Sequence, residues 1–302
     1  MEALIALENV EKRYAGSSRP ALSGVDLRIF PGDRIGLVGG NGSGKTTLFR
    51  LILRFIFPDT GKIRFNGPPE QGDFLSLVGY VPERQEGLRH FTPRELFRFA
   101  GQMHQMDGEA LNARIAEMLD MTGLVDSADR FLSAFSKGMI QRAQIGAALM
   151  HGPKVLLLDE TISGLDHGGQ KEVGLLLERL GEITLLMASH HLEQIEQFCE
   201  KVIFVKEGAL VRQIDLREEN RLRVSVDLDQ TGIDCLEAAE IVFRPGSRDG
   251  DFTALDFAVS AEELQSLMAA LHQAGARQRR LRTRSMLESL YQEYVGKGTS
   301  GP

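Results

Sequence analysis

Residues 39–47 combine the residue types that bind phosphate. They read Gly-Gly-Asn-Gly-Ser-Gly-Lys-Thr-Thr, follow the apolar run 35–38 and precede an apolar segment with helical spacing. Glycines let a loop turn tightly, so that successive backbone N–H groups face phosphate oxygens at the start of the next helix. This is the spacing of a phosphate loop and predicts binding of a nucleoside triphosphate. A chance glycine-rich turn is the alternative, and the flanking strand and helix patterns disfavour it.

Two side chains of this loop have direct roles in the predicted chemistry. Lys45 is expected to reach the β and γ phosphates and to assist phosphoryl transfer. The Thr46 hydroxyl is expected to bind a Mg2+ ion that bridges the same phosphates. The predicted nucleotide contacts are Gly39, Asn41, Gly42, Ser43, Gly44, Lys45, Thr46 and Thr47.

Two carboxylates follow the apolar run 155–158, at Asp159 and Glu160. In an open parallel sheet, ligands bind at the carboxyl ends of the strands, which is where this pattern places both acids. Asp159 is predicted to hold Mg2+, directly or through water, and Glu160 to polarise the attacking water as a general base. A solvated strand end is the alternative for the pair.

The composition excludes several other classes of protein. The 302 residues include 42 acidic and 35 basic side chains, for a formal charge of -7, which argues against a nucleic-acid partner held by a broad basic face. Cys199 and Cys235 have no zinc-site or disulfide spacing, so a reducing cytosol is expected. The amino terminus has no secretory pattern, and the apolar stretch 48–57 is too short to cross a bilayer. Any membrane role is therefore expected to depend on a partner.

Apolar runs alternate with helical segments over the first two thirds of the chain, the pattern of an α/β fold with a buried parallel sheet. The first two predicted strands form an antiparallel ribbon before the phosphate loop, and residues 92–132 are predicted to be mostly helical. Strands are expected at residues 4–10, 25–29, 62–65, 77–81, 154–158, 183–187 and 201–205.

Further motifs occur in a fixed order around these residues. Residues 135–142 read Phe-Ser-Lys-Gly-Met-Ile-Gln-Arg, residues 163–166 read Ser-Gly-Leu-Asp, and residues 188–190 read Ala-Ser-His. With Tyr14, they resemble the signature motif, the D-loop, the switch histidine and the adenine-stacking aromatic residue of the ATP-binding cassette (ABC) ATPases. The resemblance covers residues 4–214.

This resemblance implies a P-loop NTPase core of ABC ATPase type over residues 1–215, with an antiparallel β subdomain and a helical subdomain at about 92–150. It implies a homodimer that encloses two ATP molecules, in which Ser136 and Gly138 of one copy complete the phosphate site of the other. The start of the helix that follows Ser136 would supply a second anion-binding end. His190 would donate to the γ phosphate, and Tyr14 would stack on adenine. A surface histidine and a strand-end aromatic residue are the alternatives for these two.

Three positions depart from the family pattern. Glu83 stands where the family usually has a glutamine. A carboxylate keeps the affinity for a metal ion but lacks the amide donors, so Glu83 is predicted as a further Mg2+ ligand. Gln85 lies just beyond it. Thr161 replaces a common proline, and Lys137 replaces a glycine of the signature. Neither change removes a group that the chemistry requires.

Residues 216–296 have a different pattern and predict a small α+β accessory domain after a polar linker at 217–220. Apolar and polar residues alternate strictly over 222–228, as in a strand with one buried face. Capping-box spacing at Ser260 and Glu263, and again at Ser285 and Glu288, predicts two helices. Residues 297–302 are predicted to be a flexible tail.

Five arginines lie within the strand-like stretch 276–284. Such a run would attract anionic lipid headgroups or an acidic surface on a membrane partner. The alternative is a solvated face whose charge the acidic accessory domain neutralises internally. The run comprises Arg277, Arg279, Arg280, Arg282 and Arg284.

The resemblance implies a cytoplasmic ATPase subunit that is peripheral on the inner face of the membrane and drives a separate integral membrane permease. The Ser-Lys-Gly-Met signature, Glu83 and the small accessory domain look like the bacterial branch that exports drugs, lipids, ions or polymers. The alternative is a soluble nucleotide-gated ABC ATPase or regulator that is not coupled to transport. ATP and Mg2+ are the expected cofactors, and no nucleic acid is expected to bind.

Overall fold

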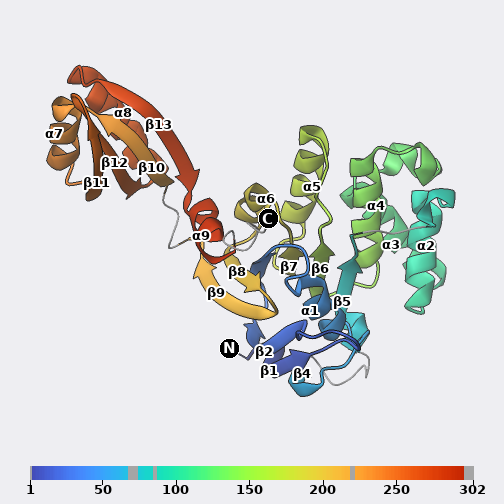
Figure 1. The fold of residues 1–302 in the computed structure, drawn as a ribbon. Coiled ribbons are helices and arrows are strands. Elements are labelled where there is room, and N and C mark those ends of the chain that lie inside the picture. Colours follow the sequence, from blue (N-terminus) through green and yellow to red (C-terminus); the bar gives the residue numbers. More distant parts are fainter. Residues whose placement is uncertain (1, 67–73, 84–86, 218–221, 296–302) are drawn as a thin grey trace. The chain divides into compact units, whose positions relative to one another are not determined.

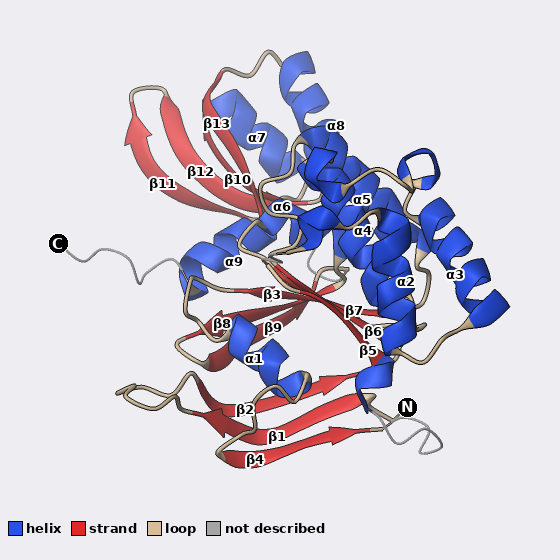
Figure 2. Cartoon of the chain, turned by 90° about the vertical axis from the view of Figure 1, so that its right-hand side faces the viewer, coloured by secondary structure: helices blue, strands red, loops and turns tan. Residues whose placement is uncertain are grey.

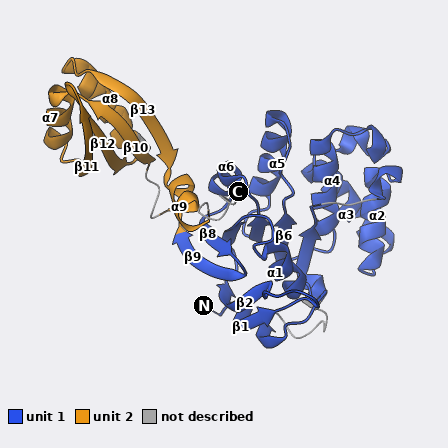
Figure 3. Cartoon of the chain, viewed as in Figure 1, with its two compact units in different colours: residues 1–214 blue, residues 215–302 orange. Residues whose placement is uncertain are grey.

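A computed structural model describes residues 2–66, 74–83, 87–217 and 222–295 of the chain (Figure 1). The chain divides into two compact units, Met1–Ile214 and Asp215–Pro302 (Figure 3). Most of the predicted linker at 217–220, Gln85 and the predicted tail at 297–302 lie outside the described residues.

The first unit is built on a six-stranded sheet in the order β5-β6-β7-β3-β8-β9. The pairs from β5 through β8 are parallel, and their apolar residues are almost fully buried because both faces of the sheet are covered. The carboxyl ends of β3, β6 and β7 therefore meet at one edge. The strands are β3 (Arg34–Val38), β5 (Val78–Val81), β6 (Val155–Asp159), β7 (Thr184–Ala188), β8 (Lys201–Lys206) and β9 (Ala209–Asp215).

A second, antiparallel sheet has the order β2-β1-β4. The predicted ribbon corresponds to β1 (Ile5–Lys12) and β2 (Leu22–Ile29), and β4 (Thr60–Phe65), which follows the phosphate loop, pairs with the other edge of β1. Helix α1 (Lys45–Ile52) lies between the two sheets (Figure 2). Its apolar residues share one buried core with both sheets, so packing fixes the helix that begins at the phosphate loop.

The remaining helices of the first unit lie mainly around residues 92–198. Helix α2 begins at a full capping box formed by Thr92 and Glu95 and buries Leu96 and Phe97. Helices α4, α5 and α6 lie on the face of the parallel sheet opposite α1 (Figure 2). The helices are α2 (Pro93–Met103), α3 (Gly108–Met121), α4 (Lys137–Leu149), α5 (His167–Arg179) and α6 (Leu192–Phe198).

The second unit has the element order β10-α7-β11-β12-α8-β13-α9, with sheet order β11-β12-β10-β13. Its first six elements form a ferredoxin-like βαββαβ fold. One face of the sheet packs on α7 and α8 around a separate apolar core. The elements are β10 (Leu222–Leu228), α7 (Gln230–Ala238), β11 (Phe243–Asp249), β12 (Phe252–Val259), α8 (Ala261–Gln273), β13 (Gln278–Ser285) and α9 (Met286–Tyr294).

The two predicted helices of the second unit correspond to α8 and α9, but their caps differ. Ser260 and Glu263 make both bonds of a capping box. At α9 only half of the predicted box is present, because Ser285 accepts from the backbone N–H of Glu288 and no return bond is formed in the described structure. Helix α7, capped by Asp229, was not predicted, because it is short and begins with Gln-Thr-Gly.

Candidate nucleotide-binding site

The phosphate loop connects the carboxyl end of β3 to the start of α1, and its backbone requires glycine. Gly44 has φ +116°, and a Cβ there would lie 2.6 Å from the carbonyl oxygen of Ala21. A Cβ at Gly39 would lie 2.3 Å from the carbonyl oxygen of Val205. Gly42 has φ +73° and, like Asn41, is exposed at the crest of the loop. Only glycine satisfies these constraints without strain.

Lys45 lies back over the loop and is 7% exposed. Its Nζ donates to the carbonyl oxygens of Gly39, at 2.7 Å, and Gly40, at 3.3 Å, and lies 3.9 Å from Glu160 Oε1. Burial lowers the pKa of Lys45, and the charges of Glu160, Asp159 and Glu83 oppose that shift. A cation is thus held beside backbone carbonyls in a position that an anionic ligand can compete for.

Asp159 is the last residue of β6 and is 3% exposed. Burial raises its pKa, whereas a hydrogen bond from Thr46 and the charge of Lys45 oppose the shift. Tyr80, on the neighbouring strand β5, was not predicted as part of this region. Burial raises the pKa of Tyr80 to about 12, with a contribution from the charge of Asp159 and a hydrogen bond to it. The sequence signal for Tyr80 was only its place in the strand beside β6.

Glu160 begins the turn after β6 and has a left-handed φ of +50°. Its backbone N–H donates to the carbonyl oxygen of Ala188, at 2.9 Å, which joins the ends of β6 and β7. Its Oε2 lies 2.7 Å from His190 Nδ1. The Glu160 side chain is 13% exposed and that of His190 is 49% exposed. A partly buried carboxylate, a half-exposed imidazole and the buried Lys45 are therefore brought together from three separate segments.

The turn that carries His190 is held by a buried pair that the sequence did not single out. Ser189 donates through its hydroxyl to Gln194 Oε1, at 3.1 Å, and accepts from the backbone N–H of His191, at 3.0 Å. The Gln194 amide donates to the carbonyl oxygen of Ile162, at 3.3 Å. These bonds connect the histidine turn to the segment after Glu160. Gln194 lies in the first turn of α6 and Ser189 lies three residues before that helix begins, and nothing in the sequence indicated that this pair would be buried.

Tyr14 and Glu83 lie at the margin of the site. The Tyr14 hydroxyl is 3.5 Å from Thr47 Oγ1 of α1, and the side chain is 37% exposed. Glu83 is exposed just after β5, and its charge acts on Lys45 and Asp159. Both residues therefore lie near the loop.

The signature residues form a separate helix start. Ser136 caps α4 by accepting from the backbone N–H of Met139, at 3.3 Å, and is exposed. Gly138 is buried, and a Cβ there would lie only 3.0 Å from Gly169 Cα, so α5 would have to shift slightly to admit it. Lys137 Nζ donates to the carbonyl oxygen of Ser163, at 2.6 Å. In the described structure no hydrogen bond or ion pair joins Ser136 or Gly138 to the phosphate loop.

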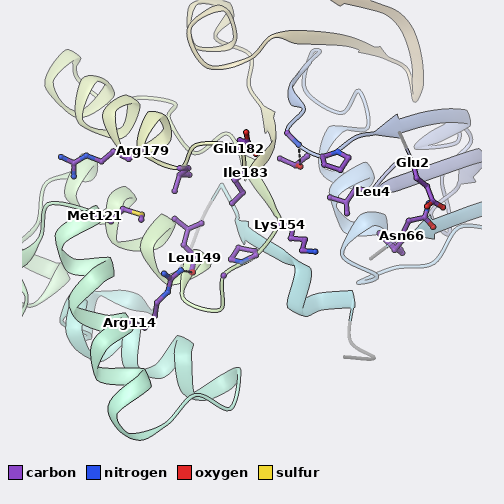
Figure 4. A pocket seen from close by; sticks show the side chains of 17 residues that line it. Glu2, Leu4, Asn66, Arg114, Met121, Leu149, Lys154, Arg179, Glu182 and Ile183 are labelled. Carbon is purple, nitrogen blue, oxygen red and sulfur yellow. Dashed lines mark hydrogen bonds between the residues drawn. The ribbon is translucent and has the colours of Figure 1, made fainter. Parts of the chain in front are cut away.

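A cavity of about 930 Å3 lies far from this chemistry, at the amino-terminal edge of the parallel sheet (Figure 4). Its lining includes Lys154 and Ile183, which immediately precede β6 and β7, and Arg114 of α3. It contains none of the predicted site residues. Because open parallel sheets bind ligands at the carboxyl ends of their strands, size alone does not make this cavity the functional site.

No helix in the described parts of the chain combines the length and apolar composition needed to cross a bilayer. Among the same residues, no three His, Cys, Asp or Glu side chains gather as a metal site of their own.

Comparisons with known proteins agree with the geometry. Residues 22–163 match the family model described as ABC transporter. The chain is 31% identical over 216 residues to the uncharacterized ABC transporter ATP-binding protein YxlF of Bacillus subtilis (strain 168), covering 71% of this chain and 72% of YxlF. It is 29% identical over 312 aligned positions to the bacitracin transport ATP-binding protein BcrA of Enterococcus faecalis, covering 99% of this chain and 98% of BcrA. The dimeric ATP-binding cassette MJ0796, solved in a post-hydrolysis state with ADP and Pi, matches the structure with a TM-score of 0.62 and 25% identity. The match covers 70% of this chain and 99% of MJ0796.

Proposed function

Because this chain belongs to the ATP-binding, ATP-hydrolysing proteins of ABC transporters, we propose that two copies of it close around two ATP molecules and drive a separate membrane permease. The observation that carries the proposal is the placement of Glu160, 2.7 Å from His190 and 3.9 Å from Lys45, beside the loop that begins α1. Phosphoryl transfer to water needs a base, a cation at the phosphates and a positioning group together at one point.

Each of the three residues has a distinct role in this proposal. Lys45 leaves the loop carbonyls and pairs with the β and γ phosphates, whose charge is a stronger acceptor than a neutral carbonyl. Glu160 accepts the proton of the attacking water. His190 orients Glu160 through Nδ1 and presents Nε2 toward the γ phosphate. The exposed ring of Tyr14 stacks on adenine, and the N–H groups of Gly39, Asn41, Gly42, Ser43, Gly44, Lys45, Thr46 and Thr47 surround the phosphates.

The oxygen groups beside the loop fit Mg2+. Thr46 and buried Asp159 already share a hydrogen bond, and Glu83 adds a carboxylate nearby. Mg2+ prefers oxygen ligands and is often held by one or two carboxylates together with substrate phosphates, so the site does not need a separate cluster of three acids. When bound, Mg2+ neutralises charge on the β and γ phosphates. Thr46, Asp159 and Glu83 are its proposed protein ligands.

The second copy completes the site. Ser136 is exposed, and α4 is thirteen residues long, so its first turn offers free N–H donors and a favourable dipole to an anion. Because these donors make no bond to the loop of their own chain in the described structure, we place them on the γ phosphate of the partner copy. The dimer of the cassette MJ0796 is a precedent for such a pair.

Export is the direction that we propose. BcrA, which is named for bacitracin transport, aligns with 99% of this chain and therefore includes a counterpart of the second unit. The protein YbhF of Escherichia coli (strain K12), named as a probable multidrug transporter component, is 33% identical over 217 residues. On this proposal the chain is cytoplasmic and is held at the inner face of the membrane by its permease.

The proposal is tested by Glu160→Gln, with Glu193→Gln in the exposed first turn of α6 as the matched control. Loss of a general base lowers turnover about 10²-fold to 10⁴-fold. We expect Glu160→Gln to bind ATP with unchanged affinity, to accumulate as an ATP-bound dimer on size exclusion, and to release almost no phosphate. The control is expected to retain full activity. Turnover near the unmodified rate in Glu160→Gln would remove Glu160 from the role of base.

A further inference from the structure

The first half of the arginine run at residues 277–284, most of which lies in β13, has partners within the second unit, as the internal alternative predicts. Three of the five guanidinium groups form ion pairs or contact an aromatic ring within this unit. Those groups therefore have local partners and do not need an external one. The contacts are Arg277–Asp229 at 3.2 Å, Arg277–Asp251 at 3.1 Å, Arg280–Asp227 at 3.6 Å, and Arg279 at 3.8 Å from the centroid of the Phe252 ring.

The second half of the run belongs to a different group of arginines. Arg282 and Arg284 of β13 are exposed, as are Arg223 of β10 and Arg244 of β11. Within residues 222–295, none of these four side chains forms an ion pair or a hydrogen bond. Four unpaired guanidinium groups in a net acidic unit are an unusual local excess of positive charge.

The strand register places these four arginines on one face of the sheet. Arg223 lies directly opposite Arg284, Ser225 opposite both Arg282 and Asp256, and Arg244 opposite Asp256. Residues directly opposite one another, and residues two apart in a strand, point to the same face. The other face carries the apolar residues that pack on α7 and α8. Figure 2 shows both helices on one side of this sheet.

This arginine face is hollowed into a groove of about 650 Å3, called here the arginine groove. All four arginines line it, together with Met286 and Ser289 of α9. Val242, which also lines the groove, is 89% exposed. Four strands spaced about 4.8 Å apart make the sheet about 14 Å wide, which accommodates one α-helix about 10 to 12 Å in diameter.

We propose that the arginine groove docks an acidic, amphipathic segment of a partner polypeptide. Carboxylates of that segment pair with Arg223, Arg282 and Arg284, because a guanidinium group matches a carboxylate in a bidentate arrangement. Binding also relieves the repulsion between Arg223 and Arg284, which are like charges on directly opposed positions. Apolar side chains of the segment cover Val242 and Met286.

The lining of the groove favours a polypeptide over a membrane or a nucleic acid. A groove is concave, whereas a bilayer presents a broad surface to a flat or convex face. Single-stranded nucleic acid binds platforms of exposed aromatic rings, but Phe243 and Phe257 of the lining pack into the core of the unit.

The test uses the full chain and a fluorescein-labelled peptide of sixteen residues with Glu and Leu at helical spacing, followed by fluorescence anisotropy. We expect Arg282→Glu with Arg284→Glu to raise the Kd about tenfold or more, since two attractive pairs become repulsive. Arg248→Glu is the matched control, because Arg248 lies on β11 with Arg244 but does not line the groove. It should change the Kd by less than about twofold. Circular dichroism and basal ATP hydrolysis confirm that each variant is folded.

Three further probes separate the proposed partner from the other classes. Replacing every Leu of the peptide by Ser should weaken binding to the wild-type chain about fivefold or more, because the apolar contacts are lost. Equal binding of the two peptides would overturn the proposal, as would equal losses in Arg248→Glu and the double variant. Tighter binding of phosphatidylglycerol vesicles or of a sixteen-nucleotide single-stranded RNA, lost in the double variant, would assign the groove to a lipid or a nucleic acid instead.

Discussion

His151 should make the stability of the first unit sensitive to mildly acidic pH. It lies between α4 and β6 with its ring stacked on that of His104, at 3.8 Å between centroids and 9° between planes. Neither ring nitrogen has a hydrogen-bond partner of normal geometry among the described residues, although the ring approaches the backbone of Val78. Burial lowers the pKa of His151 from 6.5 to about 4, with a further contribution from the charge of His104.

The sign and size of the effect follow from linkage. Between pH 6.5 and 4 the unfolded chain binds a proton at His151 and the folded chain does not, so the free energy of unfolding falls as the pH falls. One group contributes about 1.4 kcal/mol for each pH unit in this window. From pH 7.5 to pH 5 the loss is therefore about 2 kcal/mol, and the loss keeps growing until the pH passes below about 4, where both states are protonated.

His151→Phe tests this value, because phenylalanine keeps the stacking on His104 and removes the titration. Urea unfolding at pH 7.5 and pH 5, followed by far-ultraviolet circular dichroism, should show a wild-type loss about 2 kcal/mol larger than that of the variant. The transition that ATP shifts to higher urea belongs to the first unit. His90→Phe, at an exposed position, should retain the wild-type pH dependence. Parallel curves for wild type and His151→Phe would refute a depressed pKa at this site.

Three substitutions probe the nucleotide site directly. Gly44→Ala should abolish binding of a fluorescent ATP analogue and lower stability by about 1 to 3 kcal/mol, because φ is +116° and the new Cβ meets the carbonyl oxygen of Ala21. His190→Gln should retain ATP affinity, while turnover, measured by phosphate release, falls about 10²-fold or more. Unchanged turnover would show that His190 has no role in hydrolysis. Thr161→Val should lower the free energy of unfolding in urea by about 1 kcal/mol, because the hydroxyl that donates to the carbonyl oxygen of Val81 is lost. An unchanged urea midpoint would show that this bond does not stabilise the fold.

The sequence was most informative where one short segment specifies both an element and its chemistry. The run 155–158 followed by Asp159 predicts a buried strand and the acid at its end, and the structure has that strand as Val155–Asp159. The same holds for the phosphate loop, whose glycines, strand and helix are contiguous. Such features depend on local periodicity and turn geometry, which a single sequence records directly.

Features that depend on distant pairing were not predictable. Strand β4 joins β1 from beyond the phosphate loop, and no local pattern indicates that partner. The arginine run gave no sign of which members would be neutralised. That division depends on the register of β13 against β10, including an irregularity between the pairs of Ser225 and Asp227. A shift by one residue would exchange the faces of the sheet and bring a different set of arginines to the groove.

The bond between His190 and Glu160 has a consequence for the state of the histidine during turnover. An ionised Glu160 can only accept, so the proton of their 2.7 Å bond lies on Nδ1 of His190. In a neutral imidazole that carries its proton on Nδ1, Nε2 is an acceptor. Nε2 and the phosphate oxygens would then both be acceptors, and no hydrogen bond could form between them. A neutral His190 therefore donates to the γ phosphate only after it gives up the bond from Nδ1 to Glu160, so the two acceptors compete for one proton of the ring.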